Sequence, residues 1–282
     1  MCCLFLAASS TVAIAQTSVV DLVNPIIGTN GMGHTFPGAC VPFGLVQLSP
    51  DTDTIPHNVD GKYQPRSYEY CAGYQHKDSS IVGFSHTHFS GTGHSDLGDI
   101  LIMPTTGTLK LNPGTATNPD GGYRSRFSHG TEISRPGYYE VMLADYGVKA
   151  QLTTTQRVGI HKYTYPTNSE NQRIILDMIH GIYNYDGKVL WTNIRVENDT
   201  LVTGYRITNG WARTNYTYFA MSFSKPITHY GCEEKAKVDY RGGYAKFNMK
   251  ENFPDIGGRK IVAYFDFDPK MSDELEVKVA LS

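Results

Sequence analysis

The stretch that decides the fold is Leu275-Glu276-Val277-Lys278-Val279-Ala280-Leu281, near the C-terminus. Its apolar side chains recur at every second position, which is the pattern of a β-strand with one buried face. Similar alternation is found upstream in residues 148–153 and 218–223. Helical periodicity is hard to find anywhere in the chain, so the sequence predicts a protein built from strands.

Further strand-like runs extend this prediction over most of the chain. They cover residues 41–48, 81–84, 100–103, 138–143, 159–165, 173–178, 201–207 and 260–267. Turn-forming pairs such as Asp186-Gly187 separate many of them. Many short strands without intervening helices predict an all-β fold, a large two-sheet antiparallel β-super-sandwich with few or no helices.

Composition limits the class of protein. The chain has 282 residues, of which 40% are hydrophobic, and this is enough for a substantial core. Its 25 Lys and Arg against 27 Asp and Glu give a net charge of −2, which argues against a nucleic-acid partner. After residue 20, no apolar run approaches the ~20 residues that a membrane-spanning helix needs.

The N-terminus points to export. Residues 1–15 are uncharged and largely apolar, and they end in Ala13-Ile14-Ala15, a small-x-small cleavage site. We interpret residues 1–15 as the remnant of a signal peptide without its basic region, and residues 16–282 as one domain. A disordered or buried tail is the alternative. The predicted location is periplasmic or secreted.

Removal of the signal leaves Cys40, Cys71 and Cys232. Three thiols allow at most one disulfide, so a disulfide scaffold is excluded and buried free thiols are expected.

Candidate functional residues concentrate in residues 24–104, which are rich in Gly, His, Pro and Asp. His86 and His88 stand two apart, so on a strand both rings would face one side and could bind a metal with His94, Asp96 or Asp99. The Glu of a cupin-type site is missing after them. Hydrogen-bonded histidines that order a loop or donate to a ligand hydroxyl are the favoured interpretation.

Other groups in this region also leave two interpretations open. Asp96 and Asp99, with Asp78 near them, could perform glycosidic acid–base chemistry, but carboxylates that accept backbone N–H bonds in turns are favoured. Tyr68, Tyr70 and Tyr74 could form an aromatic wall for a sugar or could belong to the core. The glycines of residues 28–33 suit close approach of the backbone rather than a nucleotide loop, because the Gly-Lys-Ser/Thr ending is absent.

Several of these motifs, in this order, resemble one family, glycoside hydrolase family 92. The similar segments are Asp21-Leu-Val-Asn-Pro-Ile-Ile-Gly-Thr29, Gly33-His-Thr-Phe-Pro-Gly-Ala39, Val41-Pro-Phe-Gly-Leu-Val-Gln-Leu-Ser-Pro-Asp51, Cys71-Ala-Gly-Tyr74, Asp78-Ser-Ser-Ile-Val-Gly-Phe-Ser-His-Thr-His-Phe-Ser-Gly-Thr-Gly93, Asp96-Leu-Gly-Asp-Ile-Leu101, Phe127-Ser-His129, Pro136-Gly-Tyr-Tyr139, Arg157-Val-Gly-Ile-His161, Gly204-Tyr-Arg206 and Phe223-Ser-Lys-Pro226. The resemblance covers roughly residues 20–282.

The resemblance implies an exo-acting, inverting, calcium-dependent α-mannosidase with an N-terminal β-sandwich and a C-terminal (α/α)6 catalytic domain. The chain resembles the sandwich only, and its last strand-like run stops at Leu281-Ser282. We therefore expect a fragment that lacks the helical domain. In the family, the general acid, the general base and most Ca2+ ligands belong to that domain, so no catalytic residue and no metal ligand is assigned here.

The same resemblance implies that loops of the sandwich close one wall of the sugar pocket. The substrate-binding residues assigned by motif position are His34, Thr35, Tyr70, Ser85, His86, His88, Gly91, Thr92 and Gly93. Many relatives carry Trp in the segment that reads Ser67-Tyr-Glu-Tyr70, which leaves the leaving-group preference open. The implied partners are α-mannosides, as in N-glycan or mannan oligosaccharides, and the missing helical domain.

Three hypotheses follow for the chain itself. The first is a non-catalytic, pocket-lining domain of an α-mannosidase, inactive alone. The second is a stand-alone carbohydrate-binding module, and the third is a structural domain that only docks a helical partner.

Overall fold

The computed structural model describes residues 18–53, 55–91, 96–236 and 251–282, which form two large antiparallel sheets and two small ones. The first large sheet has seven strands. In spatial order these are β1 (Ala39–Cys40), β2 (Gln47–Asp51), β6 (Gly83–Ser85), β7 (Leu101–Thr105), β13 (Gln172–Asp177), β19 (Ile261–Phe267) and β17 (Ile227–Glu234).

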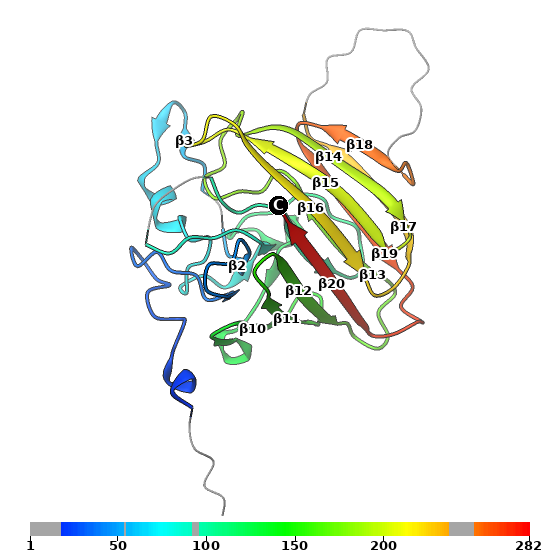
Figure 1. Cartoon of the computed structure of the whole chain (residues 1–282), viewed down its shortest axis with the longest axis horizontal. Helices are drawn as coiled ribbons and strands as arrows, with labels where there is room; N and C mark the ends of the chain where they lie inside the picture. Colours follow the sequence, from blue (N-terminus) through cyan, green and yellow to red (C-terminus); the bar gives the residue numbers. More distant parts are fainter. Residues whose placement is uncertain (1–17, 54, 92–95, 237–250) are drawn as a thin grey trace, which may run out of the picture.

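The second large sheet has nine strands and forms the broad surface that crosses Figure 1. Its spatial order is β18 (Asp255–Gly258), β14 (Val189–Asn198), β15 (Leu201–Thr208), β16 (Asn215–Phe223), β20 (Glu274–Leu281), β12 (Val158–Thr164), β11 (Val148–Thr154), β10 (Tyr138–Leu143) and β9 (Ile133–Arg135). β20 lies between β16 and β12, so the C-terminal strand joins the two parts of this sheet.

The remaining elements are short. β3 (Asn58–Val59) and β4 (Lys62–Tyr63) form a short hairpin, and β5 (Ser80–Ile81) pairs with the sequence-distant β8 (Ser125–Arg126). The helices of the described residues are all 3-10 helices: η1 (Val19–Leu22), η2 (Pro65–Tyr70), η3 (Pro119–Gly121) and η4 (His129–Thr131). The prediction of an all-β fold with few or no helices is confirmed.

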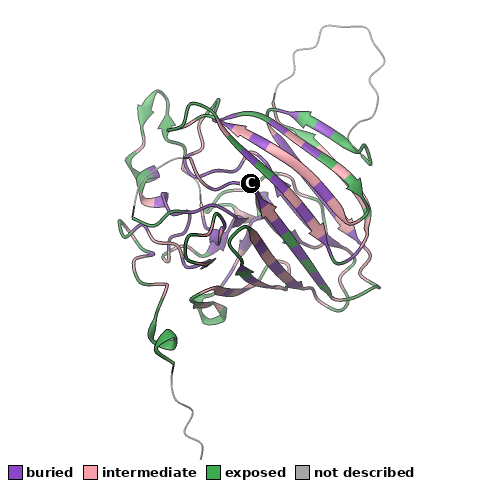
Figure 2. Ribbon diagram, in the orientation of Figure 1, coloured by how far each residue is buried: buried purple, intermediate pink, exposed green. Residues whose placement is uncertain are grey.

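The alternation of the sequence explains how the nine-stranded sheet is buried. In β20, Leu275, Val277, Val279 and Leu281 are buried and the residues between them are more exposed. Figure 2 shows the same banding along the neighbouring strands. By contrast, every residue of β7 and β13 is buried, so both faces of these strands are covered. The apolar faces of the two large sheets share one core.

Two strand predictions are wrong in detail. Residues 41–48 are not one strand, because Gly44 N–H bonds the Val41 carbonyl in a turn, and β2 begins only at Gln47. Residues 81–84 divide between β5 and β6. The sequence does not predict β14 and β17 as strands. Both contain many exposed or half-buried residues, which weakens the alternation, and β17 is also an edge strand.

Two further predictions concern the cysteines and the N-terminus. Cys40 and Cys71 are free thiols, as expected. Cys71 is buried, whereas Cys40 is exposed and Cys232 is half-buried. The proposed signal remnant, residues 1–15, lies outside the described residues. Within the described part of the chain, no helix has the length and hydropathy needed to cross a membrane.

Candidate functional site

A buried polar network lies where the N-terminal loops meet the seven-stranded sheet, and Asp51 is its centre. Asp51 ends β2 and is fully buried. His88 Nε2 lies 2.8 Å from Asp51 Oδ1, while the Ser85 hydroxyl and His180 Nε2 each lie 2.6 Å from Oδ2. Three groups from two separate segments therefore converge on one carboxylate.

The environment of Asp51 keeps this carboxylate ionised. Burial by itself would raise its pKa, but the His88 and His180 imidazoles outweigh burial and hold the pKa of Asp51 well below its usual range. A carboxylate with so low a pKa accepts hydrogen bonds and does not donate a proton at neutral pH. Asp51 therefore serves as a fixed anion that orients both imidazoles.

Gly73 lets another loop approach this network. Its φ is +80°, and a Cβ at this position would lie 1.9 Å from Asp51 Oδ1. The Gly73 carbonyl accepts the N–H of Thr52, the residue after β2. Only a glycine has both the backbone freedom and the space that this position requires.

A second buried network connects the two large sheets. Arg206 of β15 lies 2.5 Å from Asp99 through Nη2 and Oδ1, and its Nη1 donates to the carbonyls of His180 and Met178, which follow β13. Asp99 also accepts the Thr87 hydroxyl at 2.7 Å. Lys188 is buried nearby, and burial together with the Arg206 charge lowers its pKa to about 7. The buried charges of Arg206 and Asp99 therefore neutralise each other inside the protein.

His86 belongs to a third group, between the sheets. Its Nε2 lies 3.0 Å from Nε2 of His161 on β12, and its Nδ1 lies 2.6 Å from the Ile100 carbonyl oxygen. The Tyr163 hydroxyl lies 2.8 Å from His161 Nδ1. Burial lowers the pKa of His86 to about 4 and lowers that of His161 strongly, so both rings are neutral at pH 7.

The Gly-rich loop around His34 lies nearer the surface. His34 is 7% exposed with a φ of 52°, and within the described part of the chain no hydrogen-bond partner satisfies its Nε2. The Tyr68 ring meets the His34 ring edge-on, with centroids 4.7 Å apart, and Gly91 N–H donates to the His34 carbonyl at 2.8 Å. The hydroxyl of the half-buried Thr35 donates to the Ile27 carbonyl at 2.9 Å.

The predicted site residues are thus distributed over several groups. Ser85 and His88 share the Asp51 network, and His34 and Gly91 meet at the loop. Tyr70 is buried and donates to Asp78 Oδ1 at 3.1 Å, with a pKa raised by burial and by that carboxylate. His86 has different partners from His88, so the described residues do not form the metal pair considered from the sequence. Thr92, Gly93 and His94 lie outside the described residues.

The carboxylates considered for acid–base chemistry accept bonds from the protein, as favoured from the sequence. Asp96 accepts the N–H groups of Trp211 and Ala212 at 2.7 and 3.2 Å. Asp99 pairs with Arg206. Both carboxylates therefore have structural partners.

Sequence reasoning did not single out Asp51 or His180 as site residues. Asp51 stands at the end of a strand-like run, and His180 follows a buried strand, positions where a polar side chain is informative. A cavity of about 590 Å³ reaches this network, since His180 lines it with Asp53, Arg66 and Arg124. The predicted site residues are not among its lining residues.

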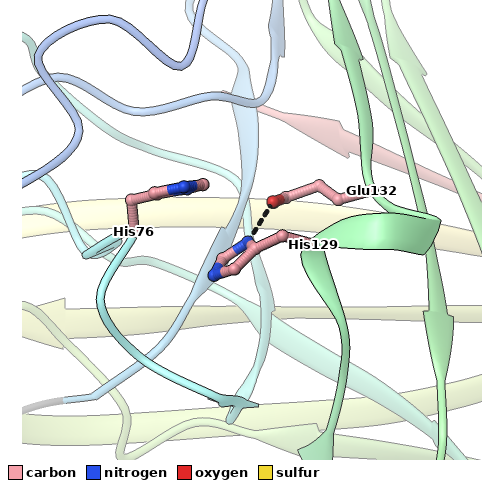
Figure 3. A group of neighbouring side chains, drawn as sticks. All are labelled: His76, His129 and Glu132. Carbon is pink, nitrogen blue, oxygen red and sulfur yellow. Dashed lines mark hydrogen bonds and ion pairs between the residues drawn. The ribbon is translucent and has the colours of Figure 1, made fainter.

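One group of side chains in the described residues has the donor atoms and spacing for a metal ion: His76, His129 and Glu132. Figure 3 shows His76 on one segment and His129 with Glu132 on another, with all three side chains in close proximity. None of the three was assigned from the sequence.

Comparisons with known proteins place these features in a family. A family model described as the glycosyl hydrolase family 92 N-terminal domain matches residues 22–282. The solved structure of a family GH92 α-mannosidase from Bacteroides thetaiotaomicron in complex with mannoimidazole aligns with a TM-score of 0.79 and 40% identity, covering 93% of this chain and 32% of that one.

Two more distant relatives are also similar to the chain. A second family GH92 protein of Bacteroides thetaiotaomicron, described as an inverting mannosidase, aligns with a TM-score of 0.69 at 24% identity over 95% of this chain and 32% of its own. A curated protein of Arthroderma benhamiae, described as an uncharacterized secreted glycosidase, is 28% identical over 57% of this chain and 19% of its own length. The chain thus spans a third or less of the relatives it matches.

Proposed function

Because the chain belongs to glycoside hydrolase family 92, as the N-terminal domain of that family, we propose that it forms one wall of the sugar pocket of an exo-acting α-mannosidase. The match over residues 22–282, with 40% identity to a solved α-mannosidase, is the observation that carries the proposal. The proposed substrates are terminal α-mannosides of N-glycans or mannans. The proposed location is periplasmic or secreted, which fits the relative described as secreted.

The proposed role is to shape the pocket and not to transfer protons. Inverting glycosidases use one carboxylic acid and one carboxylate, whose separation of about 6.5–9.5 Å leaves room for a water molecule. Asp51 and Asp99, the buried carboxylates beneath the loops, are each held by donors of this chain. The proton-transferring carboxylates are therefore proposed to come from the helical domain of the complete enzyme.

Among the described residues, the group with metal-ligating spacing does not suit the calcium ion of the family. Ca2+ binds six to eight oxygen ligands. The three-residue group of the described chain, His76, His129 and Glu132, offers two imidazole nitrogens and one carboxylate. We therefore assign no Ca2+ ligand here, and the ligands are proposed to lie mainly in the helical domain.

His34 is the residue proposed to face the sugar or the neighbouring domain most directly. Its Nε2 has no hydrogen-bond partner among the described residues, and such buried polar atoms are rare in folded proteins. A mannose hydroxyl could satisfy this nitrogen, while Tyr68 fixes the ring from one side. Thr35, Tyr70, Ser85, His88 and Gly91 are proposed to hold the surrounding loops.

The first test is an activity assay on the purified full chain with α-1,2-mannobiose, with Ca2+ and with a chelator. We expect no release of mannose under either condition. Calcium-stimulated release would overturn the proposal that the chain is non-catalytic. Calorimetry with mannose, run in parallel, separates this proposal from a stand-alone binding module, which would bind the sugar with millimolar affinity.

The second test places the chain in a complete enzyme. The chain replaces the N-terminal domain of the 40% identical α-mannosidase, and kcat/KM is measured for the chimera and two variants. We expect His34→Ala to lower kcat/KM at least about tenfold, the cost of one lost hydrogen bond to a substrate. His229→Ala, on the edge strand β17, is the matched control and should have no effect. A folded chimera whose His34→Ala variant retains full activity would contradict the role of His34.

A further inference from the structure

We propose that His76, His129 and Glu132 bind a divalent transition-metal ion of the Zn2+ class. The nitrogen-rich donor set of this site differs from the oxygen ligands that Ca2+ binds, and the proposal does not depend on the proposed function. Two imidazoles with one carboxylate form a donor set that suits Zn2+ and leaves a position open for water. Figure 3 shows the three side chains gathered from two separate segments of the chain.

The spacing of the donor atoms is close to that of a metal site. One ligand atom from each residue lies within 4.8 Å of the others, and His129 Nδ1 lies 2.7 Å from Glu132 Oε2. Ligands at about 2.0–2.1 Å from a tetrahedral ion lie roughly 3.4 Å apart. Small rotations of the side chains would therefore open the hydrogen bond between His129 and Glu132 and place an ion between the three residues.

The carboxylate is held in place by a second set of contacts. The Tyr74 hydroxyl lies 2.9 and 3.0 Å from the two oxygens of Glu132, and the Tyr139 hydroxyl lies 2.6 Å from Oε1. The Glu132 side chain is 3% exposed. Hydrogen bonds that orient a ligating carboxylate are typical of metal sites, because they reduce the cost of ordering the ligand when the ion binds.

The two imidazoles are positioned differently from the carboxylate. The rings of His76 and His129 lie with centroids 3.9 Å apart and tilted by 34°, and Phe127 meets His129 edge-on at 5.0 Å. The His129 side chain is 38% exposed, so an ion can enter from solvent. The site thus combines a buried, oriented carboxylate with one exposed and one half-buried imidazole.

A bound ion would join distant parts of the chain. His76 precedes β5, whereas His129 and Glu132 belong to η4 and its C-terminal cap before β9. The His76 N–H donates to the Thr29 carbonyl at 2.9 Å, so the ion would also fix the Gly-rich loop through this bond. Binding to the folded state alone stabilises a protein, which gives a readout independent of activity.

The experiment titrates the purified full chain with ZnCl2 by calorimetry and with CoCl2 by visible absorption. We expect one ion per chain and the d–d absorption of cobalt bound by imidazole. His76→Ala and His129→Ala should each weaken binding at least tenfold. Tyr139→Phe should weaken it about 10- to 100-fold, as the loss of a group that orients a ligand does. Zn2+ should raise the Tm of the unmodified chain, and it should raise the Tm of these three variants less or not at all.

The matched control is His229→Ala, which removes an imidazole that also lies beside a carboxylate, Asp266, at 3.5 Å. It should bind Zn2+ as the unmodified chain does. All variants contain the same cysteines, so any Zn2+ bound by thiols is the same in each and does not affect the difference in binding between them. If His76→Ala and His129→Ala, shown to be folded by circular dichroism, bind Zn2+ like the control, or if the unmodified chain binds none, the proposal is overturned.

Discussion

Gly73 has no side chain, and this allows the buried network around Asp51 to form. Its φ of +80° already disfavours any other residue, and a Cβ would lie 1.9 Å from Asp51 Oδ1. We predict that Gly73→Ala lowers the free energy of unfolding by about 3–5 kcal/mol, the cost of disrupting a buried charged group and its partners. Urea denaturation at pH 7 measures this loss.

Gly187→Ala is the matched control for the backbone. Gly187 has a φ of +87°, and a Cβ there meets no atom within 4 Å. The left-handed conformation alone costs an alanine about 1–2 kcal/mol. Equal losses for the two variants would show that contact with Asp51 contributes nothing.

At the scale of elements, Arg206 connects one strand of each large sheet. It extends from β15 to Asp99 and to the carbonyls of His180 and Met178 beyond β13, and it is fully buried. We predict that Arg206→Ala costs about 3–5 kcal/mol of unfolding free energy, because the buried Asp99 loses its cationic partner. Thermal and urea unfolding of the variant measure this cost.

Arg195, on the adjacent strand β14, provides the comparison. Its side chain is 60% exposed and lies 3.3 Å from Glu197 and 3.8 Å from Asp255. Exposed ion pairs contribute about 0–1 kcal/mol, so Arg195→Ala should be almost neutral. A large loss for Arg195→Ala, or none for Arg206→Ala, would contradict the distinction between buried and exposed pairs.

For the whole molecule, the neutral His86–His161 pair between the sheets makes the fold sensitive to acid. Burial lowers the pKa of His86 to about 4, whereas the unfolded chain takes up this proton near pH 6.5. The stability that neutral His86 contributes is therefore fully present above about pH 6.5 and is lost as the pH falls toward 4. We predict that His86 alone accounts for a loss of about 2 kcal/mol of unfolding free energy between pH 7.5 and pH 5.

Urea denaturation at several pH values, for the unmodified chain and His86→Gln, measures this dependence. The glutamine cannot titrate, so the variant should lose less stability on acidification, whatever its stability at pH 7.5. Asp51 does not interfere, because its pKa is lowered in the folded chain. Its contribution to the unfolding free energy is lost only as the pH falls through the pKa of an unfolded aspartate, about 3.9, and below. Unfolding free energies that stay constant between pH 7.5 and pH 5 would refute the prediction.

The fold class and most of the longer strands follow from local sequence patterns. Alternation at every second residue is a local property, and it predicts which face of a strand is buried before its neighbours are known. For this reason the strand prediction for residues 275–281 is confirmed, and β20 has the expected buried face. The prediction of a strand over residues 41–48 is wrong, because a turn at residues 41–44 determines where β2 begins.

The candidate site depended on the tertiary structure. His86 and His88 are two residues apart, yet one meets His161 and the other meets Asp51. Asp51 and His180 stand beside recognisable strands, but they are 129 residues apart in the sequence, so nothing local shows that they meet. Likewise, His129 and Glu132 are neighbours in the sequence, but His76 joins them only in the folded chain. Hydrogen bonds and metal sites depend on distances between side chains, and only the packing of the sheets and loops sets those distances.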